Sequence, residues 1–118
     1  MPLIFVAIGF ALLGILLMGV AQPMSRGELP PNRTVGLRTA DTLADPAVWY
    51  AANAAAGRDL FRLGAVITGA SVILPVVLGR TATPVLIVGA AAGLLGVAIA
   101  SAVRASLLRA RDSRRSLD

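Results

Sequence analysis

The chain has 118 residues, of which 57% are hydrophobic and only 14% are charged, and its net charge is +5. Because about a quarter of the residues in ordinary soluble domains are charged, this composition excludes an ordinary soluble domain. The chain has no cysteine and no histidine, which excludes disulfides, thiolate metal sites and imidazole-based catalysis.

Three apolar segments predict transmembrane helices at about residues 3–21, 60–78 and 84–103. A helix needs about 20 apolar residues to cross a hydrocarbon core about 30 Å thick. The second segment reaches that length only if the side chain of Arg62 extends to the interface. A soluble chain this short could not cover three such helices with polar surface. We therefore predict an all-α fold, an integral membrane three-helix bundle.

The connector after the first segment is rich in helix breakers. Prolines and a glycine at residues 22–31 are predicted to end the first helix, because proline lacks an amide donor and clashes with the preceding turn. Residues 32–44 are predicted to form an ordered loop, in which Gly36 suits a positive φ or a close backbone approach. A polar loop of this length exceeds what a simple turn needs, so we expect it to serve recognition.

A further helix is predicted to begin at Asp45 and Pro46, as N-cap and first helical residue. Trp49, Asn53 and Gly57 then recur every four residues and share one helix face. We expect residues 46–57 to form a short helix at the cytoplasmic interface, or to lead directly into the second transmembrane helix. The motif loop as a whole spans residues 30–58.

The third apolar segment carries a stripe of small residues on one face: Gly89, Gly93, Gly96 and Ala100. Small residues let helices approach closely in lipid. The stripe predicts either homodimerisation or packing against the other two helices of the same chain, and we favour the second interpretation because three helices must pack somewhere. The membrane domain is predicted to span residues 1–108, and residues 109–118 to form a flexible basic cytoplasmic tail.

The arginines predict the orientation in the membrane. All eleven basic residues are arginines: five lie in or beside the first connector, five follow the third segment, and Arg80 alone lies in the hairpin at residues 79–83. Because basic flanks stay in the cytoplasm, we predict an N-terminus outside and a C-terminus inside.

The first segment lacks a basic n-region, so we expect it to be a retained signal anchor. Membrane lipid, not nucleic acid, is the expected partner of these arginines.

Catalysis and transport are poorly supported. The carboxylates are Glu28, Asp41, Asp45, Asp59, Asp112 and Asp118. They lie in predicted loops or helix ends and form no dyad, triad or metal-ligand spacing. We therefore predict no enzymatic activity, no cofactor and no metal. The apolar segments contain no ionisable residue apart from Arg62, so a small oligomeric transporter ranks last among the alternatives.

The motif of the connector resembles the SdpI family, bacterial integral membrane proteins named for immunity to a secreted sporulation-delaying toxin. The resemblance rests on the run of residues 30–39 (PPNRTVGLRT), on Thr42 and Leu43, and on Trp49, Asn53 and Gly57. It implies a multi-pass protein of the bacterial inner membrane, with a peptide toxin or a cytoplasmic regulator as partner. The motif residues carried over are Asn32, Gly36, Arg38, Thr39, Trp49, Asn53 and Gly57.

Two functional hypotheses follow. In the first, an SdpI-like immunity or signalling protein uses Arg33 and Arg38 of the loop as charged donors, with Arg38 as the main electrostatic anchor. Asn32 and Gly36 are then expected to shape the loop, and Trp49 and Asn53 to present a contact face. In the second, the chain is a small accessory subunit of a larger membrane complex, held by the glycine stripe of its third helix.

Overall fold

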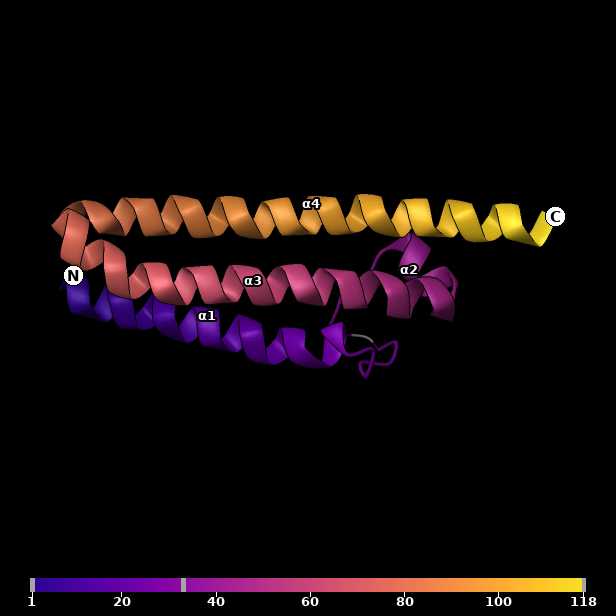
Figure 1. Cartoon of the computed structure of the whole chain (residues 1–118), viewed down its shortest axis with the longest axis horizontal. Coiled ribbons are helices and arrows are strands. Elements are labelled where there is room, and N and C mark those ends of the chain that lie inside the picture. The colour runs from indigo at the N-terminus through magenta and orange to yellow at the C-terminus, as the bar shows by residue number, and fades with distance from the viewer. Residues whose placement is uncertain (1, 33, 118) are drawn as a thin grey trace.

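The computed structural model describes residues 2–32 and 34–117, with side chains as far as residue 115, and within these ranges every regular element is helical. The elements are α1 (Leu3–Ser25), α2 (Ala40–Ala44), α3 (Pro46–Leu78), a 3₁₀ turn η1 (Gly79–Thr81) and α4 (Ala82–Leu117). Helix α3 lies between α1 and α4, and the turn between α3 and α4 lies near the start of α1 (Figure 1). The predicted all-α helical bundle is confirmed.

Helix α1 runs one turn further than predicted, to Ser25, with Pro23 inside its last turn. At the C-terminal end, the Gly27 amide donates to the Met24 carbonyl at 3.2 Å and the Glu28 amide to the Pro23 carbonyl at 2.9 Å. This pattern is the Schellman motif, with Gly27 in the left-handed region at φ 70°. The helix thus ends at this glycine and not at Pro23, which lies inside the last turn.

Helix α3 begins at the predicted position, with the Asp45 carboxylate accepting a hydrogen bond of 2.9 Å from the Ala47 amide and Pro46 in the first turn. It then continues without a break to Leu78. Residues 46–57 are therefore not a separate interfacial helix but lead directly into the second apolar segment, the second of the two predicted arrangements. The short helix in the connector is α2.

Helix α4 also exceeds its predicted range. It is helical to Leu117, so residues 109–117 extend the helix into the segment for which we predicted a flexible tail. The continuation has contacts to other elements, because Arg109 reaches Asp41 of α2 and Leu108 lies beside Val48 of α3. Arginine, alanine and leucine are also good helix formers, so the basic composition does not oppose a helix.

Glycines let α1 approach α3 closely. A Cβ atom added at Gly64 would lie 2.6 Å from the Gly14 carbonyl, and one added at Gly57 would lie 2.6 Å from the Ser25 amide. On the other side of α3, a Cβ atom at Gly93 of α4 would lie 2.5 Å from a methyl group of Leu63. Both neighbours therefore pack on α3, and α1 and α4 share few contacts with each other.

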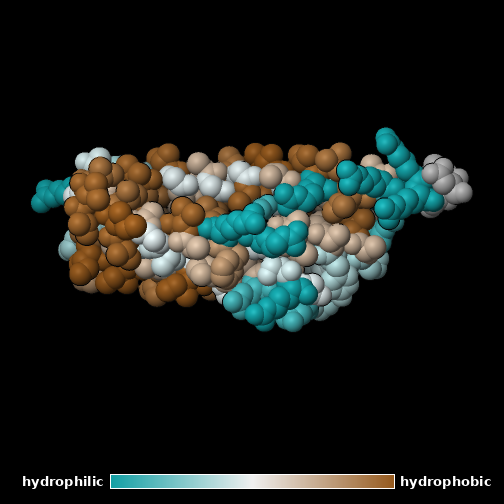
Figure 2. Space-filling view, viewed as in Figure 1, coloured by the Kyte–Doolittle hydropathy of each residue, from teal (hydrophilic) through white to brown (hydrophobic). Residues whose placement is uncertain are grey.

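The outer surface of the long helices is apolar. Side chains along α1, α3 and α4 are more than half exposed, among them Phe5, Leu16, Val76, Ile87 and Leu95. Hydrophobic residues cover the end that holds the N-terminus, and hydrophilic residues gather toward the other end (Figure 2). Two helical stretches are long and apolar enough to cross a membrane: Leu3–Ser25, and Pro46–Arg115 with its internal turn. An apolar exterior of this extent marks a membrane protein.

Candidate functional site

The candidate site is the connector between α1 and α3, folded against the first turns of α3. Its first part is shaped by Asn32. The Asn32 side-chain oxygen accepts hydrogen bonds from the amides of Thr34 at 2.9 Å and Val35 at 2.7 Å, and its amide nitrogen donates to the Pro30 carbonyl at 2.9 Å. An asparagine that bonds its own neighbours in this way builds a turn. Asn32 therefore shapes the loop from within.

Asn53 fastens the loop to α3. Its side chain is 1% exposed; the side-chain oxygen accepts from the Leu37 amide at 2.6 Å, and the nitrogen donates to the carbonyls of Leu37 at 3.3 Å and Trp49 at 3.0 Å. The backbone of Leu37 thus has both of its polar groups paired by one buried side chain. Removing that side chain would leave them without these partners, at a cost of about 1–3 kcal/mol for a buried group.

Gly36 is required where the loop meets α3. Its φ is 104°, and an added Cβ atom would lie 2.7 Å from the Asn53 side-chain oxygen and 3.0 Å from a methyl group of Leu29. The prediction of a positive φ or a close approach is confirmed, and both conditions hold. Any side chain here would strain the backbone and displace Asn53.

Trp49 and Gly57 complete the buried face of α3. The Trp49 ring is fully buried, and its indole nitrogen donates to the Leu29 carbonyl at 2.9 Å. Gly57 lies against the last turn of α1, where an added Cβ atom would be 2.9 Å from the Ala21 carbonyl. The four-residue spacing therefore does place Trp49, Asn53 and Gly57 on one face. That face is turned inward, to hold the loop and α1. The prediction that Trp49 and Asn53 present a contact face is therefore wrong, because both side chains are buried.

Thr39 begins the short helix α2. Its hydroxyl accepts from the Thr42 amide at 3.2 Å, while the Thr42 hydroxyl oxygen accepts from the Thr39 amide at 2.8 Å. This reciprocal pattern is a capping box with threonine in the place usually held by glutamate or glutamine. Thr42 is 1% exposed, and its hydroxyl also lies 2.9 Å from the Leu37 carbonyl. The pair fixes where the loop ends.

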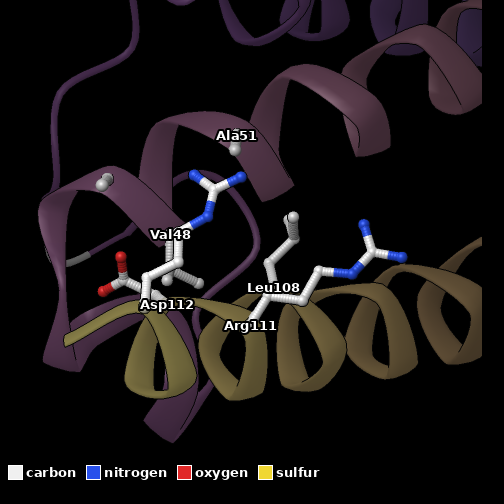
Figure 3. A pocket seen from close by; sticks show the side chains of 7 residues that line it. Val48, Ala51, Leu108, Arg111 and Asp112 are labelled. Atoms are coloured by element: carbon white, nitrogen blue, oxygen red, sulfur yellow. The ribbon is translucent and has the colours of Figure 1, made fainter. Parts of the chain in front are cut away.

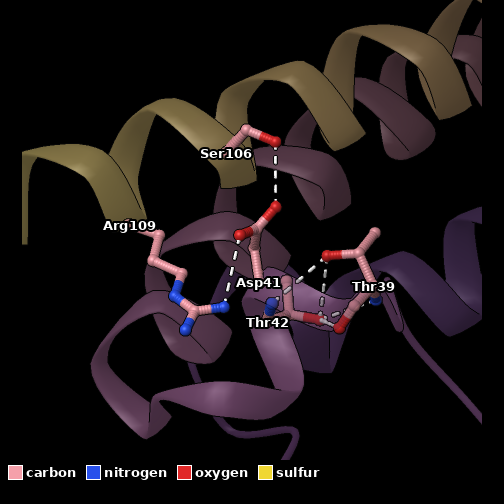
Figure 4. Close-up of polar contacts among 5 residues, drawn as sticks. All are labelled: Thr39, Asp41, Thr42, Ser106 and Arg109. Carbon is pink, nitrogen blue, oxygen red and sulfur yellow. Dashed lines mark hydrogen bonds and ion pairs between the residues drawn. The ribbon is translucent and has the colours of Figure 1, made fainter.

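An ionic contact joins α2 to the extension of α4. The Asp41 carboxylate accepts a hydrogen bond of 2.9 Å from the Ser106 hydroxyl and lies 3.5 Å from a guanidinium nitrogen of Arg109 (Figure 4). These partners are 65 and 68 residues away in the sequence. The connector is thereby tied to α4 as well as to α3.

A small cavity of about 190 Å³ lies where the end of α4 meets the start of α3. Figure 3 shows Arg111, Asp112 and Leu108 of α4 around it, with Val48 and Ala51 of α3 opposite. The pKa of Asp112 is raised because its carboxyl group shares a hydrogen bond with the Asp45 carboxylate. The same hydrogen bond, together with the Ala47 amide, lowers the pKa of Asp45.

The predicted motif residues divide into two groups. Asn32, Gly36, Thr39, Trp49, Asn53 and Gly57 come together around the folded loop, and each has an identifiable contact there. Arg38 is exposed on the outer side of the loop. Arg33, the other predicted donor, lies outside the residues that the structure describes.

The small-residue stripe of α4 is mostly turned away from the rest of the chain. Only Gly93 meets another helix; added Cβ atoms at Gly89 and Gly96 would have no heavy atom within 4 Å, and Ala100 is exposed. The glycines that pack helices within the chain are mainly Gly14, Gly57 and Gly64. Packing within the chain, the interpretation that we favoured, therefore holds for Gly93 alone among the four stripe residues.

Sequence reasoning missed two backbone anchors and the role of Thr42 in the capping box. Leu29 and Leu37 contribute carbonyl or amide groups that no side-chain pattern could reveal. Thr42 could have been found, because Thr39 and Thr42 have the spacing of a capping box.

Within residues 2–32 and 34–115, the structure brings together no group of three acidic side chains that could hold a metal ion.

The family model described as the SdpI/YfhL protein family matches residues 28–103. The match covers more than half of the chain and includes all of the connector but its first two residues, the whole of α3, and α4 as far as residue 103. No curated protein and no solved structure has a significant match to the chain. On the family match, supported by the folded connector and the apolar helices, this chain belongs to the SdpI/YfhL protein family.

Proposed function

We propose that this protein is a non-enzymatic membrane protein of immunity or signalling, which protects a bacterial cell from a membrane-active toxin through its connector loop. One observation carries the proposal. The loop is held rigidly by buried side chains, yet it leaves Val35 39% exposed, Leu43 52% exposed and the Arg38 side chain on the outside. A connector that only joined two helices would not need to present such residues on a fixed backbone.

The exposed side chains suit recognition of a peptide or protein. Val35 and Leu43 offer apolar contact area, Tyr50 of α3 is 39% exposed, and Arg38 adds a permanent positive charge. Arginine and tyrosine are enriched among the residues that dominate binding energy in interfaces. We call Val35, Arg38, Leu43 and Tyr50 the loop surface.

The proposal places the loop surface in the cytoplasm of a three-span protein. Helix α1, the apolar part of α3 and the apolar part of α4 each cross the membrane, with η1 and Arg80 outside. Apart from Arg80, the arginines would then all lie on the cytoplasmic side, as the positive-inside rule requires.

Resistance of a toxin-sensitive bacterium tests the role of the loop surface. Cells expressing the wild type or Arg38→Ala are challenged with the secreted sporulation-delaying toxin, and membrane levels of the protein are compared by immunoblot. We expect Arg38→Ala to lose at least about tenfold in protective toxin dose, the effect of removing one charged anchor worth roughly 1.4 kcal/mol. Arg114→Ala, an exposed arginine near the end of α4, is the matched control. Equal protection by Arg38→Ala and the wild type would remove Arg38 from the mechanism.

A second candidate function is that of an accessory subunit of a larger membrane complex. The outward orientation of Gly89, Gly96 and Ala100 favours it, because small residues on a lipid-facing surface permit close approach of another helix. Gly89→Leu/Gly96→Leu should then abolish co-purification of the complex while Arg38→Ala has no effect. Gly93→Leu is a poor test, since its side chain would collide with Leu63 inside the chain.

A further inference from the structure

Three arginines surround a cavity where α1 ends beside α3. The cavity has a volume of about 280 Å³ and is lined by Gln22, Ser25, Arg26, Arg58, Phe61 and Arg62. Two segments that are more than 30 residues apart in the sequence thus bring three positive charges to one hollow. At about 30 Å³ for each water molecule, the volume equals that of roughly nine waters, enough room for a phosphate group and part of a glycerol.

The acidic side chains near this cavity do not neutralise it. Among the described residues, the guanidinium groups of Arg26 and Arg58 have neither an ion pair nor a hydrogen-bond partner. Arg62 lies 3.8 Å from Asp59 but is 77% exposed, and the other oxygen of Asp59 is held at 3.1 Å by Arg104 of α4. An exposed pair at that distance is weak, so the cavity retains a strong positive charge.

The cavity lies at the level expected for lipid headgroups. At 1.5 Å per residue, Arg26 is about 34 Å from Leu3 along α1, and Arg58 is about 31 Å from Gly79 along α3. Both distances match the thickness of a hydrocarbon core, about 30 Å. The three arginines therefore stand at the boundary where the apolar surface ends and lipid phosphates begin.

We propose that this cavity, which we name the arginine cavity, binds the phosphodiester headgroup of an anionic membrane lipid. Arg26, Arg58 and Arg62 donate charge-assisted hydrogen bonds to the phosphate oxygens, for which the guanidinium fork is suited. Gln22 and Ser25 supply further polar groups, and Phe61 faces the glycerol and the start of the acyl chains. Basic hollows between membrane helices are a known form of headgroup site. This inference is independent of toxin immunity, because it needs only the membrane position of the helices.

Native mass spectrometry of the full chain in mild detergent tests the proposal. The protein is titrated with phosphatidylglycerol, with zwitterionic phosphatidylcholine, and with inorganic phosphate. We expect phosphatidylglycerol to bind at least tenfold more tightly than phosphatidylcholine. Arg26→Gln/Arg58→Gln/Arg62→Gln should lose at least tenfold in affinity for phosphatidylglycerol. Arg111→Gln/Arg114→Gln/Arg115→Gln removes the same charge from the end of α4 and should change the affinity less than twofold.

Three results would overturn the proposal. Equal losses in the two triple variants would mean that net charge alone attracts the lipid. Unchanged affinity in the first triple variant would exclude the arginine cavity. Inorganic phosphate that binds as tightly as the lipid would make a free anion the ligand.

Circular dichroism verifies that each variant is folded. If the triple variant unfolds, Arg26→Gln and Arg58→Gln are measured singly. Neither guanidinium has a partner among the described residues, so each should fold and lose at least threefold in affinity. Wild-type affinity in both single variants would also contradict the proposal.

Discussion

At the scale of single residues, Asn53 and Gly36 determine how the connector lies on α3. The Asn53 side chain pairs both polar groups of the Leu37 backbone, and Gly36 leaves the space in which that side chain lies. A buried polar network of this kind is stable only when every member is paired. These two motif residues thus determine the shape of the loop.

Gly36→Ala should destabilise the protein more than Gly27→Ala. Both glycines have a positive φ, of 104° and 70°, which costs a side chain about 1–2 kcal/mol. Only at Gly36 would the added Cβ atom meet another group, the Asn53 oxygen at 2.7 Å, whereas the space around Gly27 is open. We expect thermal unfolding in detergent to show a further loss of at least about 1 kcal/mol for Gly36→Ala. Equal losses would mean that the contact with Asn53 is unimportant.

Much of this local chemistry could be predicted from the sequence. Asp45 as the N-cap and Gly36 at a positive φ follow from the residue types alone, and both are confirmed. The partners of Trp49 and Asn53 in the connector could not be predicted, because they are backbone groups 16 to 20 residues away. Spacing shows which side chains share a face, but not whether that face is turned inward or outward.

At the scale of helices, α3 is the element on which the others pack. Its contact with α1 depends on the absence of side chains at Gly14, Gly57 and Gly64. Where two backbones touch, neither can move aside as the end of a flexible side chain would. This interface should therefore be the part of the fold most sensitive to small enlargements.

Gly64→Ala and Gly69→Ala form a matched pair on α3. The added methyl group at Gly64 would lie 2.6 Å from the Gly14 carbonyl, whereas that at Gly69 would have no heavy atom within 4 Å. We expect Gly64→Ala to destabilise the protein by about 1–3 kcal/mol. Gly69→Ala should be neutral or stabilising by up to about 1 kcal/mol, because alanine favours a helix. Thermal unfolding in detergent measures both, and similar behaviour of the two variants would contradict the close packing of α1 on α3.

The end of α4 should dock on α3 in a pH-dependent way. Asp112 has a raised pKa, so the stability that its protonated form contributes is present at low pH and is lost as the pH rises through that pKa. Asp45 has a lowered pKa, so its contribution is present at higher pH and is lost as the pH falls through that lower value. Docking should therefore be best between the two pKa values, which lie on either side of the ordinary carboxyl value of about 3.9.

Amide hydrogen exchange of residues 108–115, corrected for the intrinsic effect of pH, measures this docking. Protection should fall as the pH rises above that window, because two charged carboxylates then face each other and only Arg109 and Arg115 offset them. Asp112→Asn removes the titrating group and should abolish the change. A wild type with constant protection would show that the pair has no role in docking.

The helices could be predicted from the sequence, but several of their ends could not. Apolar length located α1, α3 and α4, but it did not predict that α4 continues to Leu117, into the residues for which we predicted a flexible tail. Ser106 and Arg109, near the start of this continuation, contact Asp41, which lies more than 60 residues earlier in the sequence. Tertiary contacts of that kind stabilise a helix beyond the length that its apolar residues predict.

At the scale of the whole molecule, polarity changes along the long axis. The molecule is 59 Å long and about 20 Å wide, with the start of α1 and the turn η1 at the apolar end and the connector and the end of α4 toward the other. A hydrocarbon core is about 30 Å thick, so close to half of the length is left for the connector and the ends of α3 and α4. This division separates an anchoring part from a part that can meet partners.

Cysteine labelling tests the proposed orientation, because the chain has no cysteine of its own. Thr81→Cys in η1 and Ala110→Cys in α4 replace exposed residues at opposite ends. An impermeant maleimide should label Thr81→Cys in intact cells and both variants after permeabilisation. Labelling of Ala110→Cys alone in intact cells would show the opposite orientation. Labelling of both variants in intact cells would show that no membrane separates the two positions.

The most direct test of the account is the survival of toxin-sensitive bacteria that express this chain. Cells with the wild type, or with an empty vector, are exposed to increasing doses of the secreted sporulation-delaying toxin, and surviving colonies are counted. The account predicts that the wild type raises the dose for half-killing at least about tenfold, a shift of roughly 1.4 kcal/mol if protection follows a binding equilibrium. Cells that hold the folded protein in their membrane and die at the same dose as the vector control would contradict it.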